Sequence, residues 1–70
     1  MEIRKISVGV DYKNAMHYVV GQEVLRGSGY IYQIQIDDGV DIWIKKDDEV
    51  LKWKSFNINM PISIEYNINF

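Results

Sequence analysis

The sequence YIYQIQIDDGVDIWI, residues 30–44, decides the fold class. In its first half large apolar side chains alternate with glutamines, the pattern of a half-buried strand, with one face carrying Tyr30, Tyr32, Ile34 and Ile36. Asp37-Asp38-Gly39 then predicts a hairpin turn. A two-residue loop would oppose apolar to polar side chains, whereas a three-residue loop with Gly39 in the left-handed region keeps apolar pairs together. The expected partners are Ile36 with Val40, Ile34 with Ile42 and Tyr32 with Ile44.

A second hairpin continues this sheet. It turns near Asp47 and Asp48, and a loop of either two or four residues sets Ile44 against Leu51 and Ile42 against Trp53. Both loop lengths place the Trp53 side chain inside.

The flanking segments predict further strands. Residues 3–10 alternate, with Ile6, Val8 and Val10 on one face, and residues 62–70 alternate more regularly after Pro61, which fits only at a strand's start. Residues 23–26 form a short strand that ends in the turn Gly27-Ser28-Gly29. Residues 11–20 break the alternation, and one short helical turn is expected near residues 14–18.

Five or six short strands in 70 residues leave exposed edges unless the sheet curls, and pairing the first strand with the last would close it. We therefore expect one all-β domain spanning residues 1–70. Its architecture is a small five- to six-stranded barrel of the Src-homology-3-like or Sm-like type, or a strongly curled antiparallel sheet.

Composition narrows the function classes. The chain has no cysteine and one histidine, which leaves oligomerisation as the reinforcement for a thin core, and its nine aromatics (five Tyr, two Trp, two Phe) exceed what so small an interior encloses. We therefore expect a homo-oligomer. The net charge of −2 disfavours nucleic acid and anionic membranes as partners. The charged N-terminus and the absence of a long apolar run indicate a cytoplasmic protein without a membrane segment.

Catalytic chemistry has few candidates. His17 is alone, there is no cysteine, and the serines lie in no nucleophile motif, so we expect a protein that is not an enzyme and carries no cofactor. The acidic residues gather at the hairpin tips, where they serve turn formation, and they lack the spacing of a calcium loop. No metal site is expected.

The sheet face opposite the core is the main candidate for ligand binding. The expected registers place on it Ile31, Gln33, Gln35, Asp41, Trp43, Lys45, Lys52 and Lys54. Trp43 would lie directly across from Lys52 on one side and Gln33 on the other, a combination suited to stacking a base and neutralising a phosphate. The alternative is that Trp43 covers the sheet or enters a subunit contact.

Two loops add candidates. Arg26 beside Gly27-Ser28-Gly29 would hold an anion, although the same residues also suit a plain hairpin turn. The irregular stretch at residues 12–18 gathers polar and aromatic groups that favour binding, namely Tyr12, Asn14, His17 and Tyr18. The alternative there is packing, with Met16 and Tyr18 closing the end of the barrel.

Three segments carry a resemblance: residues 5–9 (KISVG), 14–22 (NAMHYVVGQ) and 59–67 (NMPISIEYN). With them the chain resembles short uncharacterised proteins encoded by tailed bacteriophages. That resemblance implies an anti-defence setting in the infected host cytoplasm, and one such class consists of oligomeric sponges that sequester nucleotide signals of bacterial immunity. It carries over no functional residue.

These observations predict a homo-oligomeric protein that captures a cyclic nucleotide or an ADP-ribose-type ligand. Two alternatives stay open: a protein-interaction module that inhibits a host protein through the Trp43 side of the sheet, and a single-stranded nucleic-acid binder.

Overall fold

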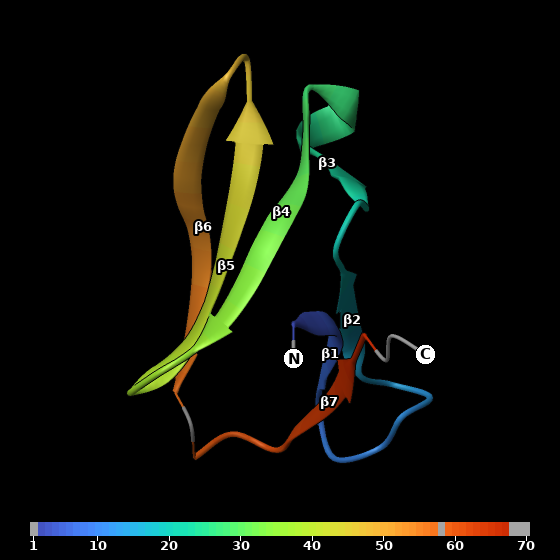
Figure 1. The fold of residues 1–70 in the computed structure, drawn as a ribbon. Helices are drawn as coiled ribbons and strands as arrows, with labels where there is room; N and C mark the ends of the chain where they lie inside the picture. Colours follow the sequence, from blue (N-terminus) through green and yellow to red (C-terminus); the bar gives the residue numbers. More distant parts are fainter. Residues whose placement is uncertain (1, 58, 68–70) are drawn as a thin grey trace.

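The protein consists of two antiparallel sheets that face each other, and the four-stranded sheet is curled into a half-barrel (Figure 1). The computed structural model describes residues 2–57 and 59–67. One sheet has the order β2-β1-β7 and the other β3-β4-β5-β6. The strands are β1 (Ile3–Val8), β2 (Met16–Val19), β3 (Glu23–Val24), β4 (Gly29–Ile36), β5 (Gly39–Lys46), β6 (Glu49–Asn57) and β7 (Ile62–Tyr66). The all-β prediction is confirmed.

The two sheets are joined where the chain passes from β2 to β3. The Val20 amide donates to the Arg4 carbonyl in the first sheet, and one residue later the Gly21 amide donates to the Ile31 carbonyl in the second. β1 pairs with β7, so the predicted pairing of the first strand with the last is confirmed. Among the described residues no ladder joins β6 to β7, so the fold is the curled, open version of the predicted barrel.

The first hairpin has the predicted register next to its turn. Ile36 pairs with Val40 and Ile34 with Ile42, but a register shift between Ile31 and Gln33 pairs Ile31, and not Tyr32, with Ile44. A bulge inserts one residue and so inverts the faces beyond it. Ile31 is consequently 0% exposed and Tyr32 46% exposed, which corrects the prediction of both side chains.

Gly39 is not in the left-handed region, so that part of the turn prediction was wrong. The position needs glycine for a different reason. A Cβ atom there would lie 2.6 Å from the Phe56 carbonyl oxygen on β6. The backbones of β5 and β6 therefore approach each other too closely for any side chain.

The second hairpin has the two-residue turn. Asp47 and Asp48 have φ values of 50° and 67°, and Ile44 pairs with Leu51 as predicted. A shift between Ile42 and Trp43 then pairs Ile42 with Lys54, so the expected partnership with Trp53 was wrong. Trp53 still packs partly buried against the core.

Other segments differ in length or type from the predictions. β1 ends at Val8, and Val10 is 92% exposed rather than half-buried. Residues 12–14 form a turn followed by β2, where a helical turn was expected near residues 14–18. The short helical turn of the described chain lies instead at Leu25–Gly27, directly after β3. β7 ends at Tyr66, and residues 68–70 of the predicted last strand lie outside the described residues.

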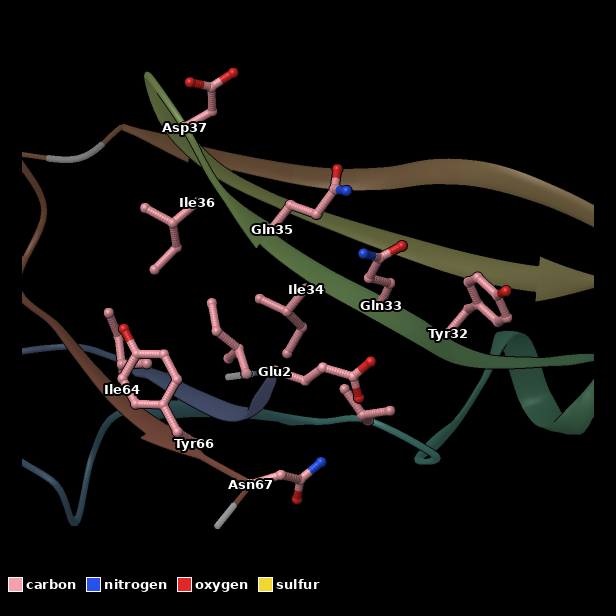
Figure 2. A pocket seen from close by; sticks show the side chains of 12 residues that line it. Glu2, Tyr32, Gln33, Ile34, Gln35, Ile36, Asp37, Ile64, Tyr66 and Asn67 are labelled. Carbon is pink, nitrogen blue, oxygen red and sulfur yellow. The ribbon is translucent and has the colours of Figure 1, made fainter. Parts of the chain in front are cut away.

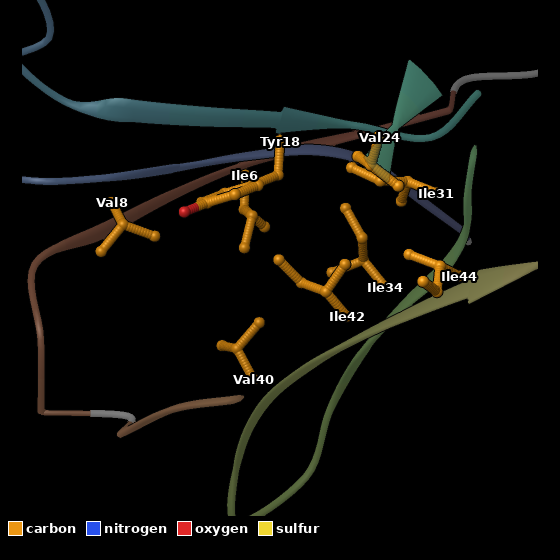
Figure 3. Packing of buried hydrophobic residues seen from close by; sticks show 9 residues of the cluster. All are labelled: Ile6, Val8, Tyr18, Val24, Ile31, Ile34, Val40, Ile42 and Ile44. Carbon is orange, nitrogen blue, oxygen red and sulfur yellow. The ribbon is translucent and has the colours of Figure 1, made fainter. Parts of the chain in front are cut away.

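The core lies between the two sheets (Figure 3). Ile6 from the first sheet meets Ile31 and Ile42 from the second, and all three are fully buried. The complete buried cluster is Ile6, Val8, Tyr18, Val24, Ile31, Ile34, Val40, Ile42 and Ile44. No helix in residues 2–57 and 59–67 is long and apolar enough to cross a membrane.

Candidate ligand-binding face

Trp43 is the centre of the outer side of the four-stranded sheet. Its partners across the neighbouring strands are Gln33 on β4 and Lys52 on β6, as predicted. The indole Nε1 donates a hydrogen bond to Gln35 Oε1 at 3.1 Å. This bond fixes the half-buried ring on the sheet surface and leaves the ring's π system to other contacts.

Lysine side chains lie over aromatic rings on this side of the sheet. Lys52 Nζ is 5.4 Å from the Trp43 ring centroid, and Lys45 Nζ is 6.0 Å from that of Tyr32. Both distances suit cation–π attraction. Lys52 also lies 3.8 Å from Asp41, whose other oxygen accepts a hydrogen bond from Ser55. Lys52 is half-exposed, so its ammonium can exchange Asp41 for an anion from solution.

We call these residues the Trp43 face: Tyr32, Gln33, Gln35, Asp41, Trp43, Lys45 and Lys52. Two predicted members do not belong to it. Ile31 is buried by the register shift in β4. Lys54 comes after the register shift in β6 and pairs with the buried Ile42, and its Nζ lies 4.9 Å from the Trp53 ring centroid. The remaining set offers two aromatic surfaces, two amides and two ammonium groups, which are the groups that bind a base and a phosphate.

The Arg26 loop is folded in on itself. Leu25 and Arg26 have φ values of 54° and 58°, and the Ser28 hydroxyl donates to the Leu25 carbonyl at 2.7 Å. The shallow depression beside this loop is lined by the carboxylates Glu23, Asp47 and Asp48, and by Lys45 as its basic residue. An acidic lining disfavours an anion there, and the structure does not bring Arg26 to the Trp43 face.

The predicted stretch at residues 12–18 divides into an exposed cluster and a core residue. Tyr18 is buried and packs against Trp53 and Phe56, with ring centroids 6.0 Å and 5.6 Å away. The packing alternative therefore describes Tyr18. It does not describe Met16, which is 61% exposed. Asn14 donates to Asp11 at 3.0 Å and closes the loop.

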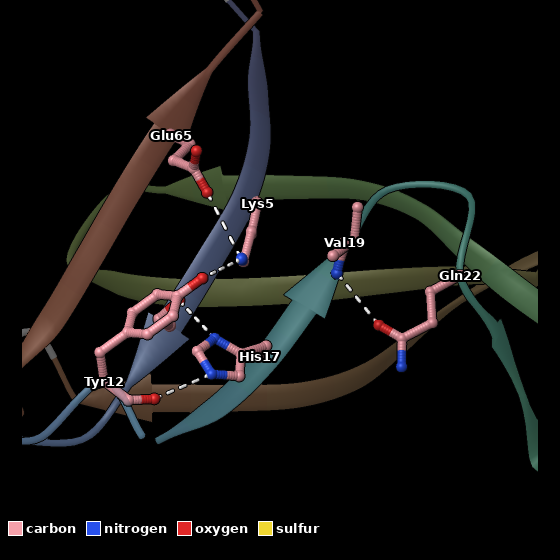
Figure 4. Close-up of polar contacts among 7 residues, drawn as sticks. Lys5, Tyr12, His17, Val19, Gln22 and Glu65 are labelled. Carbon is pink, nitrogen blue, oxygen red and sulfur yellow. Dashed lines mark hydrogen bonds and ion pairs between the residues drawn. The ribbon is translucent and has the colours of Figure 1, made fainter. Parts of the chain in front are cut away.

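His17 forms a cluster that the sequence did not reveal (Figure 4). Its Nε2 lies 3.1 Å from the Tyr12 carbonyl oxygen and its Nδ1 2.7 Å from Ser7 Oγ. Because a carbonyl can only accept, the first bond requires a proton on Nε2; in the neutral imidazole Nδ1 then accepts from Ser7. Serine bonded to an oriented histidine is the arrangement of an activated nucleophile. Ser7, however, is only 5% exposed and lies within β1. The bonds instead fasten the loop at residues 11–15 to the sheet.

Lys5 completes this cluster. Its Nζ donates to the Tyr12 hydroxyl at 2.9 Å and lies 3.5 Å from Glu65. The hydrogen bond to Tyr12 has the largest effect and raises the pKa of the Lys5 ammonium above its ordinary 10.5; burial opposes this rise, and the charges of Tyr12 and Glu65 add to it. The group therefore stays cationic at neutral pH and links β1, the loop and β7.

A groove of about 1130 Å³ separates β4 from the other sheet (Figure 2). Ile34 and Ile36 point into it toward Ile64 and Tyr66, while Gln33 and Gln35 leave β4 on the opposite side. Residues 32–37, all consecutive, form one wall. Glu2 and Asp37 contribute carboxylates, and no lysine or arginine of the described chain lines it. No pattern in the sequence predicted this groove, because the groove depends on how far the sheet closes.

Comparisons with protein-family models, with curated proteins and with solved structures find no match.

Proposed function

We propose that this protein is a homo-oligomeric binding protein whose Trp43 face captures a small anionic ligand of the nucleotide kind, a cyclic nucleotide or an ADP-ribose derivative. The observation that carries the proposal is the position of Trp43 between Gln33 and Lys52, with an ammonium group 5.4 Å from its ring centroid. An aromatic ring beside cations and amides suits a flat base joined to a phosphate.

The roles follow from the chemistry of each group. The rings of Trp43 and Tyr32 stack the base, Gln33 hydrogen-bonds its edge, and Lys45 and Lys52 meet the phosphate. On binding, the phosphate replaces Asp41 as the partner of Lys52. The resemblance to bacteriophage proteins supports the wider role that we propose: sequestration of a nucleotide signal of bacterial immunity in the cytoplasm of the infected host.

Isothermal titration calorimetry with cyclic nucleotides and ADP-ribose derivatives tests the proposal. A protein concentration of about 50 µM allows binding with a dissociation constant in the micromolar range to be detected. Trp43→Ala should weaken binding by about 1–3 kcal/mol, the contribution of stacking one base. Lys52→Met should weaken binding of phosphate-bearing ligands and leave the free nucleoside unaffected. Lys13→Met, a lysine on the distant loop, is the matched control.

No heat with any of these ligands would contradict the proposal. Binding of a single-stranded oligonucleotide with an affinity that falls steeply as salt rises, in place of the small ligand, would favour the nucleic-acid alternative. Capture of a host protein that is lost in Trp43→Ala would favour the interaction-module alternative.

A further inference from the structure

Within the described residues, the four-stranded sheet has two edges without a partner strand, along β4 after Ile31 and along β6, and they differ in character. Beyond Ile31, which bonds to Gly21 and Gln22, β4 has β5 as its partner on one side and the groove on the other. At the far end of the sheet, β6 pairs with β5 alone in the described part of the chain. Each edge therefore presents backbone hydrogen-bonding groups that can pair with another strand.

The β6 edge is long and carries two lysines and one glutamate. It runs from Glu49 to Asn57, and Val50 and Leu51 on it are 46% and 44% exposed. Lys52 and Lys54 follow these apolar residues. The length of this edge and its exposed apolar side chains leave a surface with which another strand can pair.

The groove edge is complementary to it. The groove has an apolar floor at Ile34, Ile36 and Ile64. Glu2 lies between β4 and the other sheet, and Asp37 lies at the end of β4 with its carboxylate pointing away from that floor. A strand that enters it would extend the sheet through β4, place apolar side chains on the floor and meet the carboxylates with its cations.

We infer that the occupant is the β6 edge of a second copy of this chain. Leu51 of the entering strand packs on the groove floor, and Lys54 meets Glu2 or Asp37. The contact joins two different surfaces, so each copy gives its β6 edge to one neighbour and its groove to another. Such a heterologous contact builds a closed ring, or a filament if the rotation does not close. The inference rests on the oligomeric part of the proposed function and not on its ligand.

Two sets of exposed substitutions separate the surfaces. The groove variant is Glu2→Lys/Asp37→Lys, and the edge variant is Leu51→Asp/Lys54→Glu, which leaves the Trp43 face unchanged. Sedimentation velocity should give the wild type as a defined multiple of 8.2 kDa, or as a growing polymer. Each variant alone should sediment as a monomer, with association weakened at least about tenfold by like charges. The control Lys13→Glu, a similar charge change on a remote loop, should sediment like the wild type.

Mixing the two variants is the decisive arm. The lysine-bearing edge of the groove variant fits the acidic groove of the edge variant, and the acidic edge fits the basic groove, so the mixture should associate again. Circular dichroism of each variant, and the single substitutions Asp37→Lys and Lys54→Glu, guard against loss of folding.

A wild type that stays monomeric at about 200 µM would overturn the inference, because such weak self-association could not support a functional assembly. An edge variant that assembles normally would also overturn it, since the β6 edge would then not be part of the contact. A mixture of the two variants that stays dissociated would do the same. Titrating the wild type and the monomeric edge variant with nucleotide keeps the two proposals apart. A wild type that binds nucleotide but does not assemble would contradict only the assembly, and a wild type that assembles but binds no nucleotide would contradict only the ligand.

Discussion

Ser7 and His17 face each other across β1 and β2, and the hydroxyl of one lies 2.7 Å from Nδ1 of the other. Nε2 of the same imidazole lies 3.1 Å from the Tyr12 carbonyl oxygen. The imidazole of His17 therefore joins β2 to β1 and to the loop between them through two hydrogen bonds, which hold this loop in a defined shape.

Replacing Ser7 with alanine should lower the free energy of unfolding by about 1 kcal/mol, the usual net value of one hydrogen bond. Urea denaturation followed by tryptophan fluorescence measures it. Ser63→Ala is the matched control, since Ser63 is the partner of Ser7 on β7 and is exposed. An equal loss in both variants would show that the bond to His17 contributes nothing specific.

Lys5→Met should destabilise the protein at neutral pH and lose its effect in alkali. The folded-state pKa of Lys5 is raised above 10.5, so its stabilising contribution is fully present below the unfolded pKa and disappears as the pH rises through the folded value. Denaturation of both proteins at about pH 8 and about pH 11.5 measures the difference, which should shrink at the higher pH. Lys13→Met should show no such dependence, and a constant difference for Lys5→Met would contradict the assigned contacts.

The bulge in β4 predicts opposite outcomes for two neighbouring residues. Ile31→Ala removes a fully buried side chain and should cost about 2–5 kcal/mol of stability. Tyr32→Ala changes a side chain that is nearly half exposed and should cost less than about 1 kcal/mol. Thermal denaturation compares the two. The reverse order of costs would mean that the uninterrupted alternation, and not the bulge, describes this strand.

Asp48→Gly should stabilise the second hairpin by about 1 kcal/mol, because Asp48 has a φ of 67° that glycine adopts without strain. Asp38→Gly in the first hairpin is the control, since Asp38 is not in that region and a glycine there only loosens the unfolded chain. The melting temperature should rise for the first variant and fall or stay unchanged for the second.

The parts of the fold that were predictable are those where one face alone is apolar. Ile34 and Ile36 alternate with glutamines, so only one register buries them, and both of their pairings are confirmed. In Tyr30-Ile31-Tyr32 every side chain is large and apolar, so slipping by one residue leaves the pattern satisfied, and the bulge had no signal.

The site residues that were predictable also lie where the register is determined by the apolar pattern. Trp43, Gln33 and Lys52 were placed correctly because their register follows from the first hairpin and the Ile44–Leu51 pairing. The Ser7–His17 pair was missed because β2 has no alternation of its own, and its strand form comes from pairing with β1, a contact that local sequence does not encode.

The unequal pairing of the strands sets an order of disassembly. β5 has a neighbour on both sides along nearly all of Gly39–Lys46, whereas β7 pairs with β1 on one side and, within the part of the chain that the structure describes, with no strand on the other. Amide protons of β5 should thus exchange with deuterium only when the whole domain unfolds. Amide protons of β7 should exchange through local opening, which has a lower free energy. The first partly unfolded form of this chain would therefore expose Ile6 and Val8. Aggregation of the protein would then begin with the detachment of β7.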